Sequence, residues 1–123
     1  MLAAGCAVSC SPGDAPKPDL PTSISPGWTL RKVESGSPER LPPAETPPVC
    51  WKADYASEGT ATVWVCGYRV PGSAFEAVQR MQSAAHEVKF QKGLYLVVVQ
   101  WNNVSQAGIT ALVGAVQRAL PDK

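Results

Sequence analysis

Apolar and polar residues alternate along two neighbouring stretches of the chain, residues 50–55 and 60–68. A period of two is typical of strands with one buried face, and the turn-like cluster between them predicts a hairpin. A loop centred near Glu58 sets Tyr55 opposite Ala61 and Cys50 opposite Cys66. One face then carries an apolar row, Trp51, Ala53, Tyr55, Ala61, Val63 and Val65, and the other carries Cys50, Lys52, Asp54, Thr62, Trp64 and Cys66.

The next apolar pattern has the period of a helix and predicts one over residues 74–86. Ser73 precedes it and Glu76 follows three positions later, which is the spacing of a capping box. The buried face is expected to carry Phe75, Val78 and Met81, and the single histidine, His86, is expected at the C-terminus of the helix.

A second hairpin is predicted from residues 88–91 and 94–101, around the two-residue turn Lys92-Gly93. This register sets Phe90 opposite Tyr95 and Val88 opposite Val97. Residues 94–99 are apolar without a break, as in strands that are covered on both faces. The second row, Leu96 and Val98, therefore needs a cover from the N-terminal arm or from a partner, and we predict an interaction surface there.

The last pattern predicts a helix that Ser105 caps and that stops at Pro121. Its stripe is Ile109, Leu112, Val113, Val116 and Leu120. Together the elements predict an α+β fold, an antiparallel sheet of four or five strands with both helices packed on one face.

Proline divides the 123-residue chain, because ten of the twelve prolines lie between residues 11 and 48. Proline blocks both helix and sheet, so residues 11–48 are predicted as an arm or linker that contributes little core. A short strand over residues 28–33 is the exception. Residues 49–121 form the predicted α+β domain, which is marginal at that size, so a covalent cross-link matters.

Residues Leu2-Ala3-Ala4-Gly5-Cys6 resemble a bacterial lipobox, in which the cysteine receives a lipid. Gly5 fits the pattern, whereas Leu2 stands four positions before Cys6 instead of three. A signal peptide also needs a basic start and an apolar stretch of about 7–15 residues, for which residues 1–5 are too short. We predict a truncated lipoprotein signal over residues 1–10 with Cys6 lipidated. The truncation would mean that the true start lies further upstream or that the chain is a trimmed product. The alternative is that Cys6 is an ordinary N-terminal cysteine, and Cys10 is a weaker candidate for lipidation.

The predicted register makes Cys50 and Cys66 a candidate disulfide, because opposed residues of antiparallel strands lie within bridging distance. A pair of reduced thiols, or a shifted register, is the alternative. In the reduced case Cys66 and His86 are the candidates for a thiol-dependent enzyme. No other catalytic group, cofactor or metal site is predicted, since a single histidine excludes a two-histidine site and Cys6 and Cys10 lack a further ligand.

Four tryptophans are many for this length. Trp64 falls on the face opposite the predicted core, where we expect it to pack beneath the N-terminal arm; the alternative is that the indole anchors a sugar or a protein partner. The net charge is +1 with both signs interspersed, so we predict no nucleic-acid partner.

One resemblance extends from Trp51 to Leu120, with an outlying match at Gly27-Trp28. The matching features are Ala53-Asp54-Tyr55, the strand through Val63 and Val65, Ala74-Phe75-Glu76, Phe90-x-Lys92-Gly93-x-Tyr95 and the closing helix. Their order resembles a family of small exported bacterial proteins of unknown function. The resemblance implies export and a single α+β domain, and it carries no catalytic residues across.

These observations favour a non-enzymatic binding or interaction module, held at the cell envelope or periplasm by a lipid on Cys6. Its expected partners are the membrane, through that lipid, and an envelope protein or a glycan. The alternatives are the thiol-dependent enzyme and, if no upstream signal exists, a cytosolic subunit that needs a partner over Leu96 and Val98.

Overall fold

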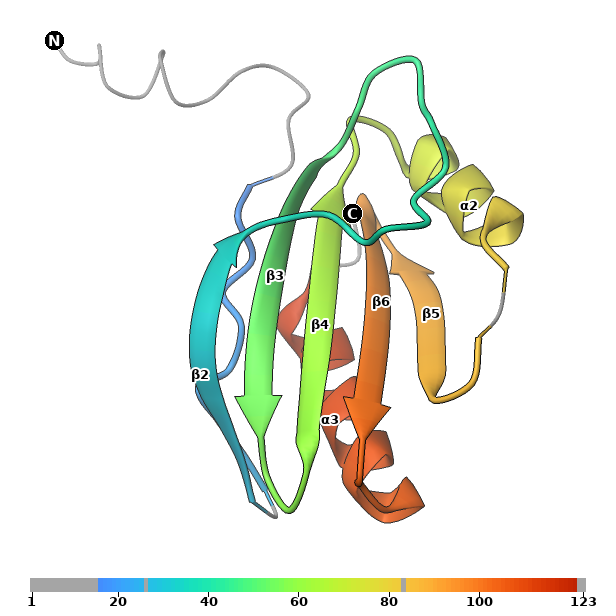
Figure 1. Cartoon of the computed structure of the whole chain (residues 1–123). Coiled ribbons are helices and arrows are strands. Elements are labelled where there is room, and N and C mark those ends of the chain that lie inside the picture. The colour runs from blue at the N-terminus through green and yellow to red at the C-terminus, as the bar shows by residue number, and fades with distance from the viewer. Residues whose placement is uncertain (1–15, 26, 83, 122–123) are drawn as a thin grey trace, which may run out of the picture.

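The computed structural model describes residues 16–25, 27–82 and 84–121. Within them the chain is α+β, and six antiparallel strands form one curled sheet in the order β1-β2-β3-β4-β6-β5 (Figure 1). The elements are β1 (Ser23–Ile24), β2 (Trp28–Ser35), β3 (Val49–Ala56), β4 (Thr60–Gly67), α2 (Pro71–Arg80), β5 (Glu87–Lys92), β6 (Tyr95–Asn102) and α3 (Gln106–Ala119).

The register of the first hairpin, β3 with β4, confirms the prediction. Tyr55 pairs with Ala61 and Cys50 pairs with Cys66. The apolar row on one face was sufficient to fix this register, because a slip by one residue would turn that row toward the opposite face.

The second hairpin, β5 with β6, differs from the prediction by a shift of two residues. Its turn is residues 93–94 rather than 92–93, and Gly93 adopts the positive φ of 58° that the turn requires. A shift of two keeps every side chain on its own face, so the hydrophobic pattern does not distinguish the two registers. The observed pairs include Val88↔Val99, Phe90↔Val97 and Lys92↔Tyr95.

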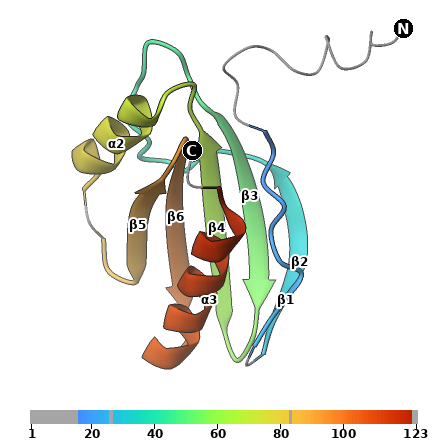
Figure 2. The same cartoon turned by 180° about the vertical axis from the view of Figure 1, so that it is seen from behind.

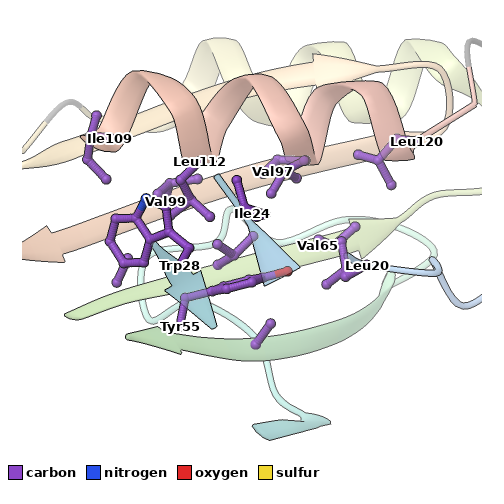
Figure 3. Close-up of a cluster of buried hydrophobic side chains, with 14 of the residues drawn as sticks. Leu20, Ile24, Trp28, Tyr55, Val65, Val97, Val99, Ile109, Leu112 and Leu120 are labelled. Carbon is purple, nitrogen blue, oxygen red and sulfur yellow. The ribbon is translucent and has the colours of Figure 1, made fainter. Parts of the chain in front are cut away.

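Helix α3 covers one face of the sheet (Figure 2). The predicted N-cap is confirmed, since the hydroxyl of Ser105 accepts a hydrogen bond of 3.1 Å from the Gly108 amide. Beneath the helix lies the main core, to which α3 contributes Ile109, Leu112, Val116 and Leu120 and the central strands contribute Val63, Val65, Val97 and Val99 (Figure 3).

Helix α2 packs on the opposite face, so the prediction that both helices share one face is wrong. Its buried residues Ala74 and Ala77 lie in a second cluster with Leu96 and Val98, whereas α3 packs over the alternate residues of β6. The unbroken apolar run of β6 serves both clusters, and successive side chains of a strand point to opposite faces.

The bounds of α2 correct the prediction, and its buried face agrees with it at Met81 and Val78, which lie at the second cluster, but not at Phe75. The helix starts at Pro71 and ends at Arg80, and the cap position Val70 provides no side-chain hydrogen bond. Proline suits the first turn of a helix because its missing N–H would have no partner there. Small alanines let the helix approach the sheet closely, and Phe75 on its other side is 51% exposed instead of buried.

The proline-rich arm contributes to the core, which corrects the expectation that it adds little. Leu20 and Ile24 are buried in the main cluster together with Trp28. β1 lies inside the arm and pairs with β2, which raises the number of strands above the predicted four or five. The expected strand over residues 28–33 is present as β2.

Residues 36–48, the crossing segment, connect β2 to β3 by a long excursion instead of a tight turn. The segment passes in front of β3, β4 and β6 toward α2 before it returns to β3 (Figure 1). Leu41 packs against the second cluster, and the Gly36 amide donates 3.2 Å to the carbonyl of Cys50. The sheet face that carries α2 is therefore covered at one end and open further along the strands.

Candidate binding site

Two rows of side chains run across the sheet on the α2 face. The pairing registers of neighbouring strands place each row on one level of the sheet. The first row is Glu34, Lys52, Trp64, Val98 and Lys89, and the second row is Lys32, Asp54, Thr62, Gln100 and Glu87. Apart from Trp64 and Val98, which contact the second cluster, these side chains are polar or charged, so the two rows lie mostly outside that cluster.

A groove of about 610 Å³ lies between these rows and the start of the crossing segment. Trp64, half-buried, comes from the middle of the sheet, and Met81 comes from the end of α2. We call this hollow the Trp64 groove. Its other lining residues are mostly polar: Glu34, Ser35, Gly36, Ser37, Pro38, Glu39, Arg40, Lys52, Glu87 and Gln100.

One wall of the groove is fixed by an ion pair between segments distant in sequence. Nη2 of Arg40 lies 3.1 Å from Oε2 and 3.3 Å from Oε1 of Glu87, and the amide of Gln100 donates 2.7 Å to Oε2. The Glu87 side chain is only 3% exposed, and these two partners provide its carboxylate oxygens with hydrogen bonds. Arg40 is 48% exposed and keeps further N–H groups for a ligand.

The opposite wall carries a weaker arrangement of charges. Nζ of Lys32 lies 3.2 Å from Oε1 of Glu34, and both side chains are well exposed. Such a surface pair contributes little to stability and can open for a ligand. Lys52, which pairs with Glu34 across the strands, stands beside Trp64 at the floor.

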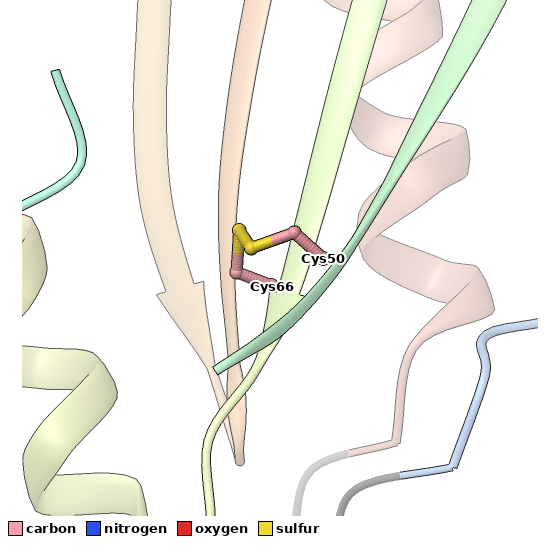
Figure 4. The surroundings of a disulfide bond; sticks show 2 residues. All are labelled: Cys50 and Cys66. Carbon is pink, nitrogen blue, oxygen red and sulfur yellow. A yellow bond between two sulfur atoms is a disulfide. The ribbon is translucent and has the colours of Figure 1, made fainter. Parts of the chain in front are cut away.

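The cysteines of the first hairpin form the predicted disulfide, which joins β3 to β4 (Figure 4). The Cα atoms of Cys50 and Cys66 are 4.0 Å apart, and Cys66 is fully buried. Cys66 is therefore bonded to Cys50 and does not provide the free thiol that the thiol-dependent alternative requires.

His86, the other residue of that alternative, is not at a helix C-terminus. It follows α2 at some distance in the chain and adopts a left-handed φ of 57° just before β5. Its ring lies 6.1 Å from the ring of Trp101, centroid to centroid, and its carbonyl accepts from the Trp101 amide at 3.2 Å. Both contacts join His86 to Trp101 of β6, so His86 is part of the turn that leads into β5.

The interaction surface expected over Leu96 and Val98 is covered within the chain itself. Leu96 is fully buried and Val98 is 1% exposed, because α2 and Leu41 pack over them. Helix α2 is thus the main cover of Leu96 and Val98. Of the three residues predicted to form an interaction surface, Trp64 alone lines a hollow at the surface.

Cys6 and Cys10 lie outside the described residues. In the part of the chain that the structure does describe, no three His, Cys, Asp or Glu side chains gather in a group that could hold a metal ion. None of the described helices is long and apolar enough to cross a bilayer.

Comparisons with known proteins add no name to this site. No family model, curated protein or solved structure matches the chain. The features of the molecule that bear on its function are therefore those of the groove itself.

Sequence reasoning found Trp64 but missed the residues around it. Arg40 lies in the segment predicted as a linker, Glu87 lies just before the predicted strand 88–91, and Gln100 lies in a strand whose observed pairing differs from the predicted one by two residues. The alternation of β5, which places Glu87 and Lys89 on one side, was the available indication of a polar face there.

Proposed function

We propose that this chain is a non-enzymatic binding module of the cell envelope, lipid-anchored through Cys6, that holds a glycan in the Trp64 groove. The observation that carries the proposal is the half-buried indole at the floor of a hollow whose walls are carboxylate, amide and guanidinium groups. The chain's resemblance to small exported bacterial proteins agrees with it.

The chemistry of the groove suits a sugar. A pyranose ring has faces of C–H groups that pack on an indole and a rim of hydroxyls that need hydrogen bonds. The planar side chains of Arg40 and Gln100 and the carboxylate of Glu34 provide donors and acceptors around Trp64. A volume of about 610 Å³ is within the range of small-molecule sites and accommodates one or two sugar rings.

The disulfide supports the proposed compartment. Bridges between cysteines persist in secreted and periplasmic proteins and are rare in the cytosol. A lipid on Cys6 would hold the module at the membrane, and stable attachment would require two or more acyl chains.

Binding is tested by titrating the protein with chito-oligosaccharides and with soluble cell-wall glycan fragments. We expect Trp64→Ala to weaken binding by about tenfold, which corresponds to about 1.4 kcal/mol. Trp51→Ala is the matched control, because Trp51 is also half-buried but packs against the main core on the other face. Equal affinity of the wild type and Trp64→Ala, or no binding by the wild type, would overturn the glycan proposal.

The anchor is tested separately by expressing the gene with its upstream sequence in bacteria fed an alkyne fatty acid. Label is expected on the wild type and on Cys10→Ala but not on Cys6→Ala. Label that survives Cys6→Ala would refute lipidation at this position.

A further inference from the structure

The three tyrosines of this chain are all buried, and among the described residues two of them have a partner for the hydroxyl. Tyr55 donates 2.7 Å to the carbonyl of Pro21, and Tyr95 donates 2.6 Å to the carbonyl of Pro16. The hydroxyl of Tyr68 has no hydrogen-bond partner among the described residues. Buried polar groups normally find one, so the exception at Tyr68 needs an explanation.

Tyr68 follows β4 directly and is held firmly in place. Its amide donates 2.8 Å to the carbonyl of Leu94, and its ring packs in the second cluster with Ala74 and Ala77 of α2. The residue is only 2% exposed. Burial raises the pKa of this phenol above its usual value, since desolvation disfavours the charged form.

The same tyrosine lines a second hollow, separate from the Trp64 groove. This hollow, of about 480 Å³, lies between residues 43–46 of the crossing segment and α2. We call it the Tyr68 hollow. Its charged residues are of both signs, Arg69 and Arg80 on one hand and Glu45 and Glu76 on the other.

Arg80, Glu45 and Glu76 form no ion pair with any residue that the structure describes. The hollow thus offers a buried donor, an available cation and two available carboxylates. An uncompensated buried hydroxyl calls for an acceptor atom, and a carboxylate is the strongest acceptor that an arginine also attracts. The two glutamates suit a ligand that carries an ammonium group as well.

We propose that the Tyr68 hollow binds a small zwitterion, a free dipeptide or a similar amino-acid derivative. Its carboxylate accepts from the hydroxyl of Tyr68 and pairs with Arg80, and its ammonium lies against Glu45 or Glu76. A hollow of about 480 Å³ holds a dipeptide, since small-molecule sites span about 300–1,000 Å³.

Access to the hydroxyl requires a small movement of the chain. The hydroxyl oxygen is closed to solvent, and residues 43–46 line the hollow together with Tyr68. Among the described backbone hydrogen bonds, none holds residues 43–46 to a neighbouring element. This part of the crossing segment can therefore shift outward and close again over a ligand, as loops at binding sites commonly do.

The test uses the full chain and three probes, the dipeptide Ala-Ala, its C-terminal amide and its N-acetyl derivative, in calorimetric and NMR titrations. Ala-Ala is expected to bind, and the amide is expected to lose affinity by about tenfold or more. N-acetyl-Ala-Ala should also bind more weakly, because it lacks the ammonium group.

Two variants probe the protein side. Tyr68→Phe removes only the hydroxyl oxygen, and Arg80→Gln removes the cation; each is expected to weaken Ala-Ala binding by about tenfold. Trp51→Ala is the control that leaves Ala-Ala binding unchanged, because Trp51 packs against the main core on the other face and does not line this hollow.

Stability distinguishes a binding role from a structural one. Tyr68→Phe should unfold at the same denaturant concentration as the wild type or at a higher one, since the variant buries no unpaired hydroxyl. Tyr55→Phe and Tyr95→Phe should unfold at lower concentrations, because each leaves a carbonyl without its donor. No binding of Ala-Ala up to about 10 mM, or equal binding by the wild type and Tyr68→Phe, would refute the proposal.

Discussion

The indole N–H of Trp28 donates a hydrogen bond of 2.9 Å to the carbonyl of Gly108, eighty residues further along the chain. Trp28 lies at the start of β2 and is 2% exposed, and Gly108 lies in the first turn of α3. The bond therefore joins the N-terminal part of the sheet to the last helix.

We predict that Trp28→Phe lowers the free energy of unfolding by about 2–4 kcal/mol, from the lost hydrogen bond and the space left by the smaller ring. Urea denaturation measures the change. Trp101→Phe is the control with a smaller expected effect, because Trp101 is only half-buried. Equal losses in the two variants would contradict the role given to the Trp28 contact.

The arm is expected to behave as part of the domain. Leu20→Ala should destabilise the protein by about 2–4 kcal/mol because Leu20 lies in the main core. Asp19→Ala, at the exposed neighbouring position, should change the free energy of unfolding by less than about 0.5 kcal/mol. A Leu20→Ala variant as stable as the Asp19→Ala variant would show that the arm is a tether after all.

The tip of the first hairpin leaves no room for a side chain. A Cβ on Gly59 would meet the carbonyl oxygens of Asn102 and Asn103 at 2.1 and 2.4 Å, whereas a Cβ on Gly72 would meet nothing within 4 Å. Gly59→Ala should therefore destabilise by about 1–3 kcal/mol. Gly72→Ala, within α2, should stabilise by about 0.5–1 kcal/mol. Thermal melts of the two variants provide the comparison, and melting shifts in the same direction would contradict this account.

The disulfide closes a loop of 16 residues and should contribute about 3 kcal/mol of stability. The double variant Cys50→Ala, Cys66→Ala is expected to lose that amount in denaturation without reductant. Dithiothreitol should destabilise the wild type and leave the double variant unchanged. A wild type that is insensitive to the reductant while its thiols become titratable would refute the stabilising role.

Alkaline pH should unfold the protein through its tyrosines. Desolvation by burial raises the pKa of Tyr55 to about 12, and it raises those of Tyr68 and Tyr95 above the usual 10. Because the folded pKa values exceed the unfolded ones, this contribution is complete below pH 10 and is lost as the pH rises toward 12. Denaturation midpoints from pH 8 to 12 should fall above about pH 10, and less so in Tyr55→Phe.

The sequence predicted the helices and strands better than it predicted how they pair and pack. The alternation around Glu58 determined the register of β3 and β4 because one face is apolar and the other is not. In β6, both rows are apolar, so the pattern could not tell which helix covers which face. The pairing of β5 was equally open to a shift of two residues, since such a shift preserves the faces.

The candidate site was predictable only in part, because it is assembled from distant segments. Trp64 was found from strand periodicity, but Arg40 meets Glu87 only through the path of the crossing segment, which no local pattern describes. The short strand β1 was missed for a similar reason. Its two residues pair because Leu20 and Ile24 are drawn into the core, a tertiary effect that outweighs the local preference of proline-rich sequence.

The route of the crossing segment determines the order in which parts of this fold can form during synthesis. Leu41 leaves the ribosome before α2 is made, yet the cluster it joins includes Ala74 and Ala77. Until that helix docks, Leu41 lacks its contacts with α2, and both hollows lack the part of their lining that α2 and its C-cap provide. The walls of the two hollows are thus completed late, only after most of the sheet has been synthesised.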